Sequence, residues 1–242
     1  MFLTETNVLA VTCKQYLVKL KAVSFSGLVI LQAVILVFWT GGMGMYGASN
    51  VLISLSVRNY SSDIVIIATM IWALALAIMQ TKKQAKNMDF TLVSNRLTSC
   101  LSDIGILATI SFLGALTSVF SGMLQRLLMY FALEHSTIIN SSFKPPLAEL
   151  ALDVVAVALY IFLIAAGGYL FGMLLEISRL FAFLIPALIL GLARGQNNYF
   201  TDFLGFYITE TSLLLFAGKV LLTSALCFAL SILIYNRMEV RR

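Results

Sequence analysis

Residues 147–174 read LAELALDVVAVALYIFLIAAGGYLFGML, and this stretch decides the fold class of the chain. Its only charged side chains are Glu149 and Asp153, both near its beginning. A helix needs about 20 consecutive apolar residues to cross the ~30 Å hydrocarbon core of a bilayer. Because a helix pairs its own backbone N–H and C=O groups, it is the structure expected where water is absent. We therefore predict a transmembrane helix here.

Five further stretches have the same apolar character: residues 23–46, 64–80, 104–124, 177–193 and 213–235. Over the whole chain 60% of residues are hydrophobic and 11% are charged, with a mean hydropathy of +0.97. Soluble domains average about 45–50% apolar and about 25% charged residues. We predict an all-α polytopic membrane protein with six transmembrane helices, forming a single transmembrane domain over residues 1–242.

The lysines and arginines fall mainly on one side of the predicted membrane. With the N-terminus inside, eleven of the sixteen lie in cytoplasmic segments: Lys14, Lys19, Lys21, Lys82, Lys83, Lys86, Arg96, Arg179, Arg237, Arg241 and Arg242. Cytoplasmic loops carry an excess of Lys and Arg. Both termini are therefore predicted to be cytoplasmic, in an integral protein of a bacterial cytoplasmic membrane. Anionic lipid accounts for the net charge of +5, and no nucleic-acid partner is expected.

Ahead of the first span, apolar residues recur at helical spacing: Leu9, Cys13, Tyr16, Leu17 and Leu20. Lysines fall elsewhere on the helical wheel: Lys14, Lys19 and Lys21. This pattern predicts an amphipathic helix on the cytoplasmic face, followed by a bend into the membrane. The alternative is a plain cytoplasmic flank that supplies positive charge.

The longest cytoplasmic connection, residues 81–102, begins with a basic run of Lys82, Lys83 and Lys86. Apolar residues follow at helical spacing: Phe90, Val93, Leu97 and Leu101. Asp89 is placed to cap a short helix, and Asp103 could cap the third span in the same way. A surface helix with an apolar stripe can dock into a groove of a soluble partner. The alternative is an interfacial helix that only anchors the loop.

Two ionisable residues inside predicted spans are candidates for a pair. Asp153 and Lys219 each lie about six residues, or ~9 Å, from the outer ends of their helices. Equal depth permits an ion pair between the fourth and sixth spans. In the alternative, Lys219 extends to the outer headgroups and Asp153 is hydrated near a helix N-terminus.

Small residues indicate where helices approach closely. Gly168-x-x-x-Gly172 in the fourth span and Gly114-x-x-x-Ser118-x-x-x-Gly122 in the third would allow close backbone contact, within one subunit or between two.

Signatures of catalysis and metal binding are missing from the sequence. It contains no G-x-x-x-x-G-K-[ST] phosphate loop, no G-x-S-x-G nucleophile turn and a single histidine, His135. Its three cysteines have no metal-binding spacing. The chain is therefore not expected to be an enzyme or to bind a metal or cofactor itself.

The order of these features resembles the type-2 permease class of ATP-binding-cassette transporters at minimal length. The order is a surface helix, six spans, a helical cytoplasmic loop after the second span and an aromatic segment, 194–212, before the last. The nearest local match is the run from Asp89 to Arg96, DFTLVSNR, which is similar in position and character to the loop that these permeases set against their ATPase.

The resemblance implies an elbow helix containing Lys14, Tyr16, Lys19 and Lys21. It also implies an ATPase-coupling loop containing Lys82, Lys83, Lys86, Asp89, Phe90, Val93, Arg96 and Leu97. A second permease subunit, the same or related, and separate ATPase subunits that bind ATP and Mg would be the partners, with membrane lipid around them.

The expected function is export of an amphipathic peptide, antibiotic or lipid-like substrate, and the sequence identifies no substrate-binding residues. The alternatives are a membrane-embedded substrate-binding subunit of an importer and a non-transporting immunity or sensor protein.

Overall fold

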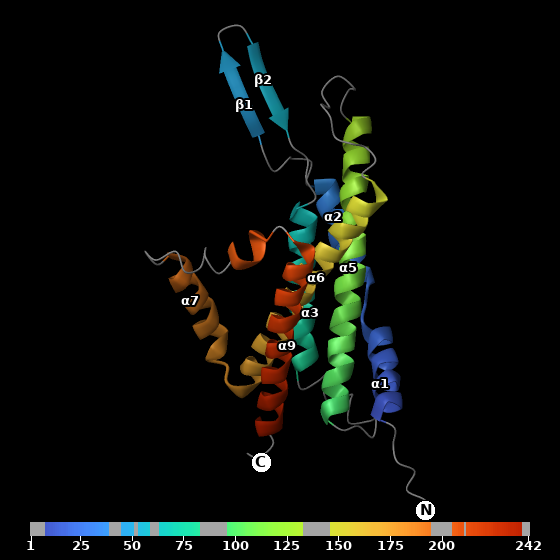
Figure 1. Ribbon diagram of the computed structural model, residues 1–242, viewed down its shortest axis with the longest axis vertical. Coiled ribbons are helices and arrows are strands. Elements are labelled where there is room, and N and C mark those ends of the chain that lie inside the picture. The colour runs from blue at the N-terminus through green and yellow to red at the C-terminus, as the bar shows by residue number, and fades with distance from the viewer. Residues whose placement is uncertain are drawn as a thin grey trace, which may run out of the picture. The chain divides into compact units, whose positions relative to one another are not determined.

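The computed structural model describes residues 8–38, 45–50, 53–58, 63–82, 96–132, 146–194, 205–210 and 212–238. The elements, labelled in Figure 1, are α1 (Val8–Ala22), α2 (Ser26–Phe38), β1 (Met45–Asn50), β2 (Ile53–Arg58), α3 (Asp63–Thr81), α5 (Arg96–Ala132), α6 (Leu147–Ile177), α7 (Phe181–Arg194) and α9 (Leu213–Met238). The prediction of a predominantly helical protein is confirmed. The hairpin of β1 and β2 is the exception to an all-α fold.

Four of the described helices are long and apolar enough to cross a bilayer: Asp63–Thr81, Leu97–Gln125, Leu147–Ile177 and Leu213–Tyr235. The bent pair Val11–Ala22 and Ser26–Phe38, with an angle of 43° between its parts, gives a fifth candidate when counted as one span. The apolar part of α7, Phe181–Leu192, is shorter than a full span. These helices support an integral membrane protein, while the count of six spans and the cytoplasmic position of both termini stay predictions.

The first span ends earlier than predicted. We expected it to run from residue 23 to 46, but α2 ends at Phe38, and Met45 and Tyr46 belong to β1. Residues 39–44, between these two elements, lie outside the described residues.

The described chain forms two compact units. Unit 1 contains Met1–Val23, Ala73–Ser111 and Phe162–Arg242, and unit 2 contains Ser24–Trp72 and Phe112–Ile161. The helices α3, α5 and α6 each contribute residues to both units. The prediction of a single transmembrane domain is not tested by this division and stays a prediction.

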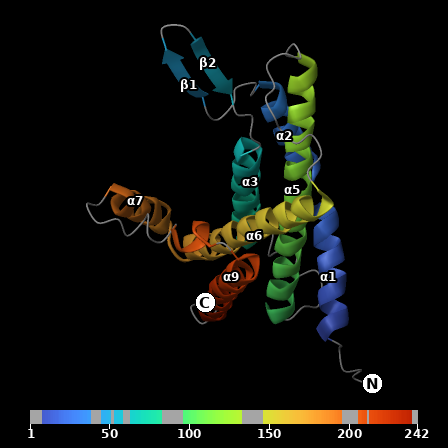
Figure 2. The same cartoon turned by 45° about the horizontal axis from the view of Figure 1, so that its top comes forward.

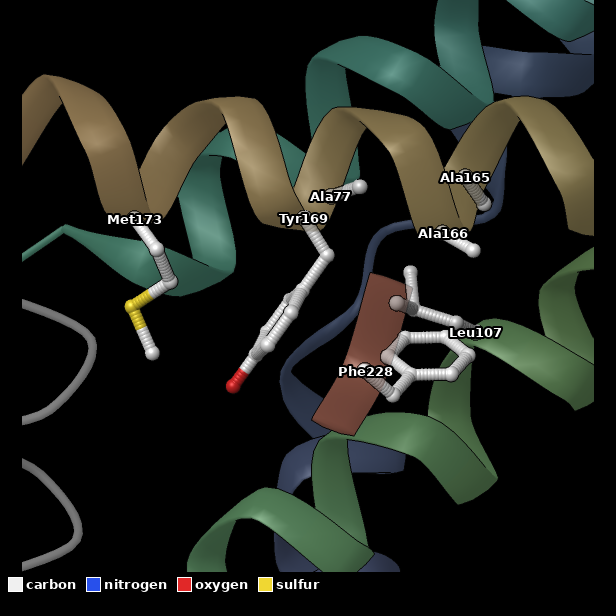
Figure 3. Close-up of a cluster of buried hydrophobic side chains, with 7 residues drawn as sticks. All are labelled: Ala77, Leu107, Ala165, Ala166, Tyr169, Met173 and Phe228. Atoms are coloured by element: carbon white, nitrogen blue, oxygen red, sulfur yellow. The ribbon is translucent and has the colours of Figure 1, made fainter. Parts of the chain in front are cut away.

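The core of unit 1 joins four helices. Its buried side chains are Ala77 of α3, Leu107 of α5, Ala165, Ala166, Tyr169 and Met173 of α6, and Phe228 of α9 (Figure 3). The Phe228 ring lies 5.8 Å, centroid to centroid, from the ring of Tyr169. In lipid, helices associate through packing rather than through burial of apolar area from water. Small alanines between larger rings permit that packing.

Close contact between α6 and α3 depends on two glycines. A Cβ added at Gly168 would lie 3.1 Å from the Leu74 carbonyl oxygen, and one at Gly172 would lie 3.1 Å from the Ile78 Cα and collide with the Thr81 hydroxyl. Both distances are too short for a side chain to fit without movement of the neighbouring backbone. The predicted close approach at Gly168 and Gly172 is confirmed, and it lies within one chain.

In unit 2 one amide joins three helices. Gln32 of α2 donates from Nε2 to Thr69 Oγ1 of α3 and to Thr117 Oγ1 of α5, each at 3.1 Å. Thr69 in turn donates to the Val65 carbonyl oxygen at 2.7 Å. A Cβ added at Gly114 would lie 3.0 Å from Thr69 Cγ2. The glycine therefore lets α5 approach α3 closely enough for the amide to bridge them.

We expect Gly172→Ala to lower the free energy of unfolding by about 1–3 kcal/mol, because the added methyl overpacks the contact between α6 and α3. Gly167→Ala is the matched control, since a Cβ at Gly167 meets nothing within 4 Å. Thermal unfolding in lipid nanodiscs measures both variants. Equal stability of the two variants would show that α6 does not approach α3 at Gly172.

Candidate functional site

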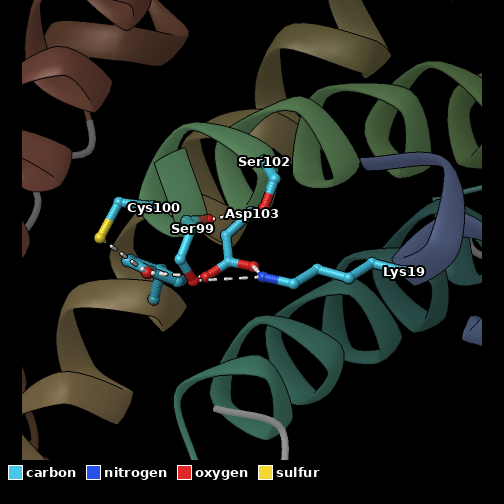
Figure 4. Close-up of polar contacts among 6 residues, drawn as sticks. Lys19, Ser99, Cys100, Ser102 and Asp103 are labelled. Atoms are coloured by element: carbon cyan, nitrogen blue, oxygen red, sulfur yellow. Dashed lines mark hydrogen bonds and ion pairs between the residues drawn. The ribbon is translucent and has the colours of Figure 1, made fainter. Parts of the chain in front are cut away.

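The candidate site is a buried ion pair between α1 and α5. Lys19 Nζ lies 2.6 Å from Asp103 Oδ1, and the two side chains are only 18% and 5% exposed (Figure 4). Both residues fall in apolar helices that count toward the candidate membrane spans. Ionisable groups at membrane depth are rare and costly, and they usually mark function. In both ribbon views α1 runs beside the first half of α5 (Figures 1 and 2).

Both carboxylate oxygens of Asp103 are occupied. Oδ2 accepts a hydrogen bond of 3.1 Å from the hydroxyl of Tyr169, which is 1% exposed and projects from α6. Lys19 Nζ also donates to Ser99 Oγ at 3.4 Å. Burying a charge without partners costs several kcal/mol per ion, so a salt bridge at this depth requires such additional hydrogen bonds. The network links α1, α5 and α6 of unit 1.

Helical spacing explains how the site is built. Ser99 and Asp103 are separated by four residues and therefore lie on one face of α5. The long stem of Lys19 carries its ammonium group across to that face. Tyr16, one turn earlier on α1, packs over Gly105, where an added Cβ would lie 3.3 Å from the tyrosine ring. The absence of a side chain at Gly105 thus lets α1 lie against α5.

Gln15 lies on the same face of α1 as Lys19, four residues before it. It is fully buried, and among the described residues neither its amide oxygen nor its amide nitrogen has a hydrogen-bond partner. An unpaired amide in an apolar setting costs about 1–3 kcal/mol on mutational scales. Gln15 therefore reduces the stability of the α1 contact in this arrangement.

The structure corrects the prediction for Asp103. We expected its carboxylate to cap the beginning of the third span, but α5 begins about two turns earlier, at Arg96. Thr98, Ser99 and Ser102 are buried, so this part of the chain packs as helix rather than as a surface loop. Leu97 and Leu101 belong to the same continuous helix and are about half exposed.

The predicted coupling loop is described only at its two ends. Lys82 is exposed directly after α3, and Arg96 and Leu97 begin α5. Lys83, Lys86, Asp89, Phe90 and Val93 lie outside the described residues. The assignment of these residues to a coupling loop stays a prediction.

The four residues of the predicted elbow helix all lie in α1 but have different surroundings. Lys14 and Lys21 are exposed, and Tyr16 is half-buried against Gly105. Lys19 pairs with Asp103 of α5, although its spacing grouped it with Lys14 and Lys21. A helix at this position, followed by a bend, is observed, and its placement on the cytoplasmic surface stays a prediction.

Lys219 of α9 forms an ion pair with Glu210, a partner that the sequence pattern did not indicate. Its ammonium group also donates to the Phe206 carbonyl oxygen at 3.3 Å and lies 3.8 Å from the centroid of the Phe206 ring. These contacts hold the segment 205–210 against the beginning of α9. Asp153 is an exposed residue of α6, and the proposed Asp153–Lys219 pair stays a prediction.

The site offers one carboxylate, one ammonium group and one phenol hydroxyl, and the last two each donate a hydrogen bond to the carboxylate. In the described part of the chain, no three or more His, Cys, Asp or Glu residues are grouped so that they could hold a metal ion. This arrangement can fix a helix by charge and can respond to loss of that charge. Comparison of the chain with protein-family models, curated proteins and solved structures gives no match.

We expect Lys19→Met or Asp103→Asn alone to lower the free energy of unfolding by about 3–5 kcal/mol, because each leaves the other charge buried and unpaired. The double variant should recover most of that loss. Lys14→Met, which removes an exposed lysine of the same helix, should change it by less than about 0.5 kcal/mol. The measurement is a double-mutant cycle of thermal unfolding in nanodiscs, and additive losses would contradict the ion pair.

Gln15→Met should raise the free energy of unfolding by about 1–3 kcal/mol, because an apolar side chain of similar length replaces an unpaired amide. Gln32→Met is the matched control, since Gln32 is also buried but bridges two threonines, and it should be destabilising. The same unfolding assay measures the stability of both variants. A loss of stability for Gln15→Met would mean that its amide is bound by a group such as an internal water molecule.

Proposed function

We propose that the chain is the membrane-spanning permease subunit of a transporter of the ATP-binding-cassette type. It would act with separate ATPase subunits and with a second permease subunit, the same or related. The observation that carries this proposal is the position of the Lys19–Asp103 network, which joins α1 to the beginning of α5. The basic connection between α3 and α5 leads directly into that helix.

The network would transmit force from a partner to several helices. A partner that pushed on the residues between Lys82 and Arg96 would move the first turns of α5, because the helix begins where the connection ends. Asp103 lies in these turns, so the ion pair would move α1 along with α5. Tyr169 would carry the same displacement to α6 through its hydrogen bond. The network thereby connects one cytoplasmic contact point to three helices of unit 1.

The energy source would lie in the partner. ATP and Mg would be bound by the ATPase subunits, and this chain would contribute the path through the membrane. We propose an amphipathic peptide, antibiotic or lipid-like substrate and the direction of export, in a bacterial cytoplasmic membrane with both termini in the cytoplasm.

Replacement of Lys82, Lys83 and Lys86 by glutamate, or of Phe90 and Val93 by aspartate, should abolish the effect of this chain on the ATP hydrolysis of a co-purified ATPase. The physical reason is that these changes remove the basic and apolar contacts expected at the docking surface. Membrane insertion should be unchanged.

Arg179→Glu is the matched control, because Arg179 is an exposed cation in the turn between α6 and α7, outside the connection. Unchanged coupling in the loop variants would contradict the coupling-loop assignment. If no ATPase co-purifies at all, the chain would instead fit a binding subunit of an importer or an immunity or sensor protein.

A further inference from the structure

The second half of α5 has the opposite arrangement to a helix of a soluble protein. Its large side chains Phe120, Leu124 and Phe131 are 47–75% exposed. The described positions of α5 beyond residue 112 that are buried carry only small or polar residues: Gly114, Ala115, Ser118, Ser121, Gly122 and Gln125. Because most of this stretch belongs to a candidate membrane span, the exposed apolar side chains meet lipid. The polar face of the helix is therefore turned inwards.

This buried face of α5 contacts the other helices of unit 2. Thr117 accepts a hydrogen bond of 3.1 Å from Gln32 of α2. A Cβ added at Gly114 would lie 3.0 Å from Thr69 Cγ2 of α3 and 3.7 Å from Ile161 Cδ1 of α6. Gln32 and Thr69 are only 5% and 0% exposed. Hydroxyl and amide groups from three helices thus meet in the interior of unit 2, and these groups are uncharged.

Ser121 is the residue of this face whose hydrogen bonding is incomplete. It is 8% exposed, and in the described part of the chain its hydroxyl has no hydrogen-bond partner. Ser118, by contrast, donates to the Ala115 carbonyl oxygen of its own helix at 2.9 Å. A buried hydroxyl without a partner costs about 1–3 kcal/mol on mutational scales. A partner from outside the chain would remove that cost.

The spacing around Ser121 suits a small hydrogen-bonding partner. Thr117 and Gln125 lie four residues before and after it, on the same side of the helix. Residues at this spacing have Cβ atoms about 5–6 Å apart, a gap that one water molecule or one ligand hydroxyl bridges with two hydrogen bonds of about 2.8 Å. From Gly114 to Gln125 the polar face extends ~16 Å along the helix, about half the thickness of the hydrocarbon core.

We propose that the buried face of α5 in unit 2 is a hydrated site, which binds water and the uncharged hydroxyl or amide groups of a ligand inside the membrane. The groups around Ser121 donate and accept hydrogen bonds without carrying charge. A neutral polar group therefore recovers there the hydrogen bonds that it loses on leaving water, whereas an ion remains poorly solvated. This inference needs only an embedded chain, and it does not depend on the proposed transport function.

The test compares two adjacent positions of α5, one on the polar face and one facing lipid. In the full chain with Cys13, Cys100 and Cys227 replaced by serine, a cysteine is introduced by Ser121→Cys or by Phe120→Cys. Each protein is reconstituted into phosphatidylcholine vesicles and treated with uncharged hydroxyethyl methanethiosulfonate. Because the reactive thiolate forms only where water can solvate it, position 121 should react about tenfold faster than position 120.

The anionic reagent sulfonatoethyl methanethiosulfonate, of similar size, tests the absence of charge in the site. It should react with the cysteine at position 121 about tenfold more slowly than the uncharged reagent, because an ion is costly at this depth. Equal rates for the two reagents would overturn the assignment of an uncharged site.

Water-edited solid-state NMR of the unmodified protein gives a second measurement that needs no substitution. Magnetisation from water should reach the Ser121 Cβ at least twice as fast as the Phe120 Cβ. If polar residues only join the helices of unit 2, the site is dry. Equal transfer to the two residues, or equal reaction rates at positions 120 and 121, would show such a dry contact and overturn the proposal.

Discussion

A charge in a bilayer has to be paired, and the contact between Lys19 and Asp103 satisfies this requirement for two helices at once. Each buried group alone would be costly, whereas together, with Tyr169 and Ser99, they form an ion pair with additional hydrogen bonds. The N-terminal helix α1 is thereby bound to the beginning of α5. The proposed movement of α1 together with α5 depends on this one attachment.

Around that pair, the helices of unit 1 are held together by close packing. Gly168 and Gly172 let α6 lie against α3, and that placement brings Tyr169, on the same helix, within hydrogen-bond distance of Asp103. Tyr169 also packs against Phe228 in the apolar core. The same residue therefore belongs to both the core and the ionic network, so packing and charge pairing in this unit are not independent. A loosened contact between α6 and α3 would weaken the network as well.

The features predicted most accurately from the sequence are those that depend on local composition. The helices α3, α6 and α9 begin within one residue of their predicted positions, because the length of an apolar run is a local signal. Lys19 and Asp103 are 84 residues apart, and spacing within one helix cannot reveal such a pair. A signal was nonetheless present: Asp103 directly precedes the apolar stretch that begins at residue 104 and falls inside the candidate span Leu97–Gln125, where an acidic residue calls for a partner. The strands β1 and β2 were missed because residues 45 and 46 were assigned to the end of the first span.

The most direct test of the account is a solid-state NMR measurement of the Lys19–Asp103 contact in lipid bilayers. Dipolar coupling between a ¹⁵N-labelled lysine Nζ and a ¹³C-labelled aspartate Cγ reports their separation, which the 2.6 Å N–O distance places within about 4 Å. We expect a strong coupling that disappears in Lys19→Met and persists in Lys14→Met. If the intact protein shows no coupling at this distance, α1 is not attached to α5, and the proposed transmission from the connection between α3 and α5 has no structural basis.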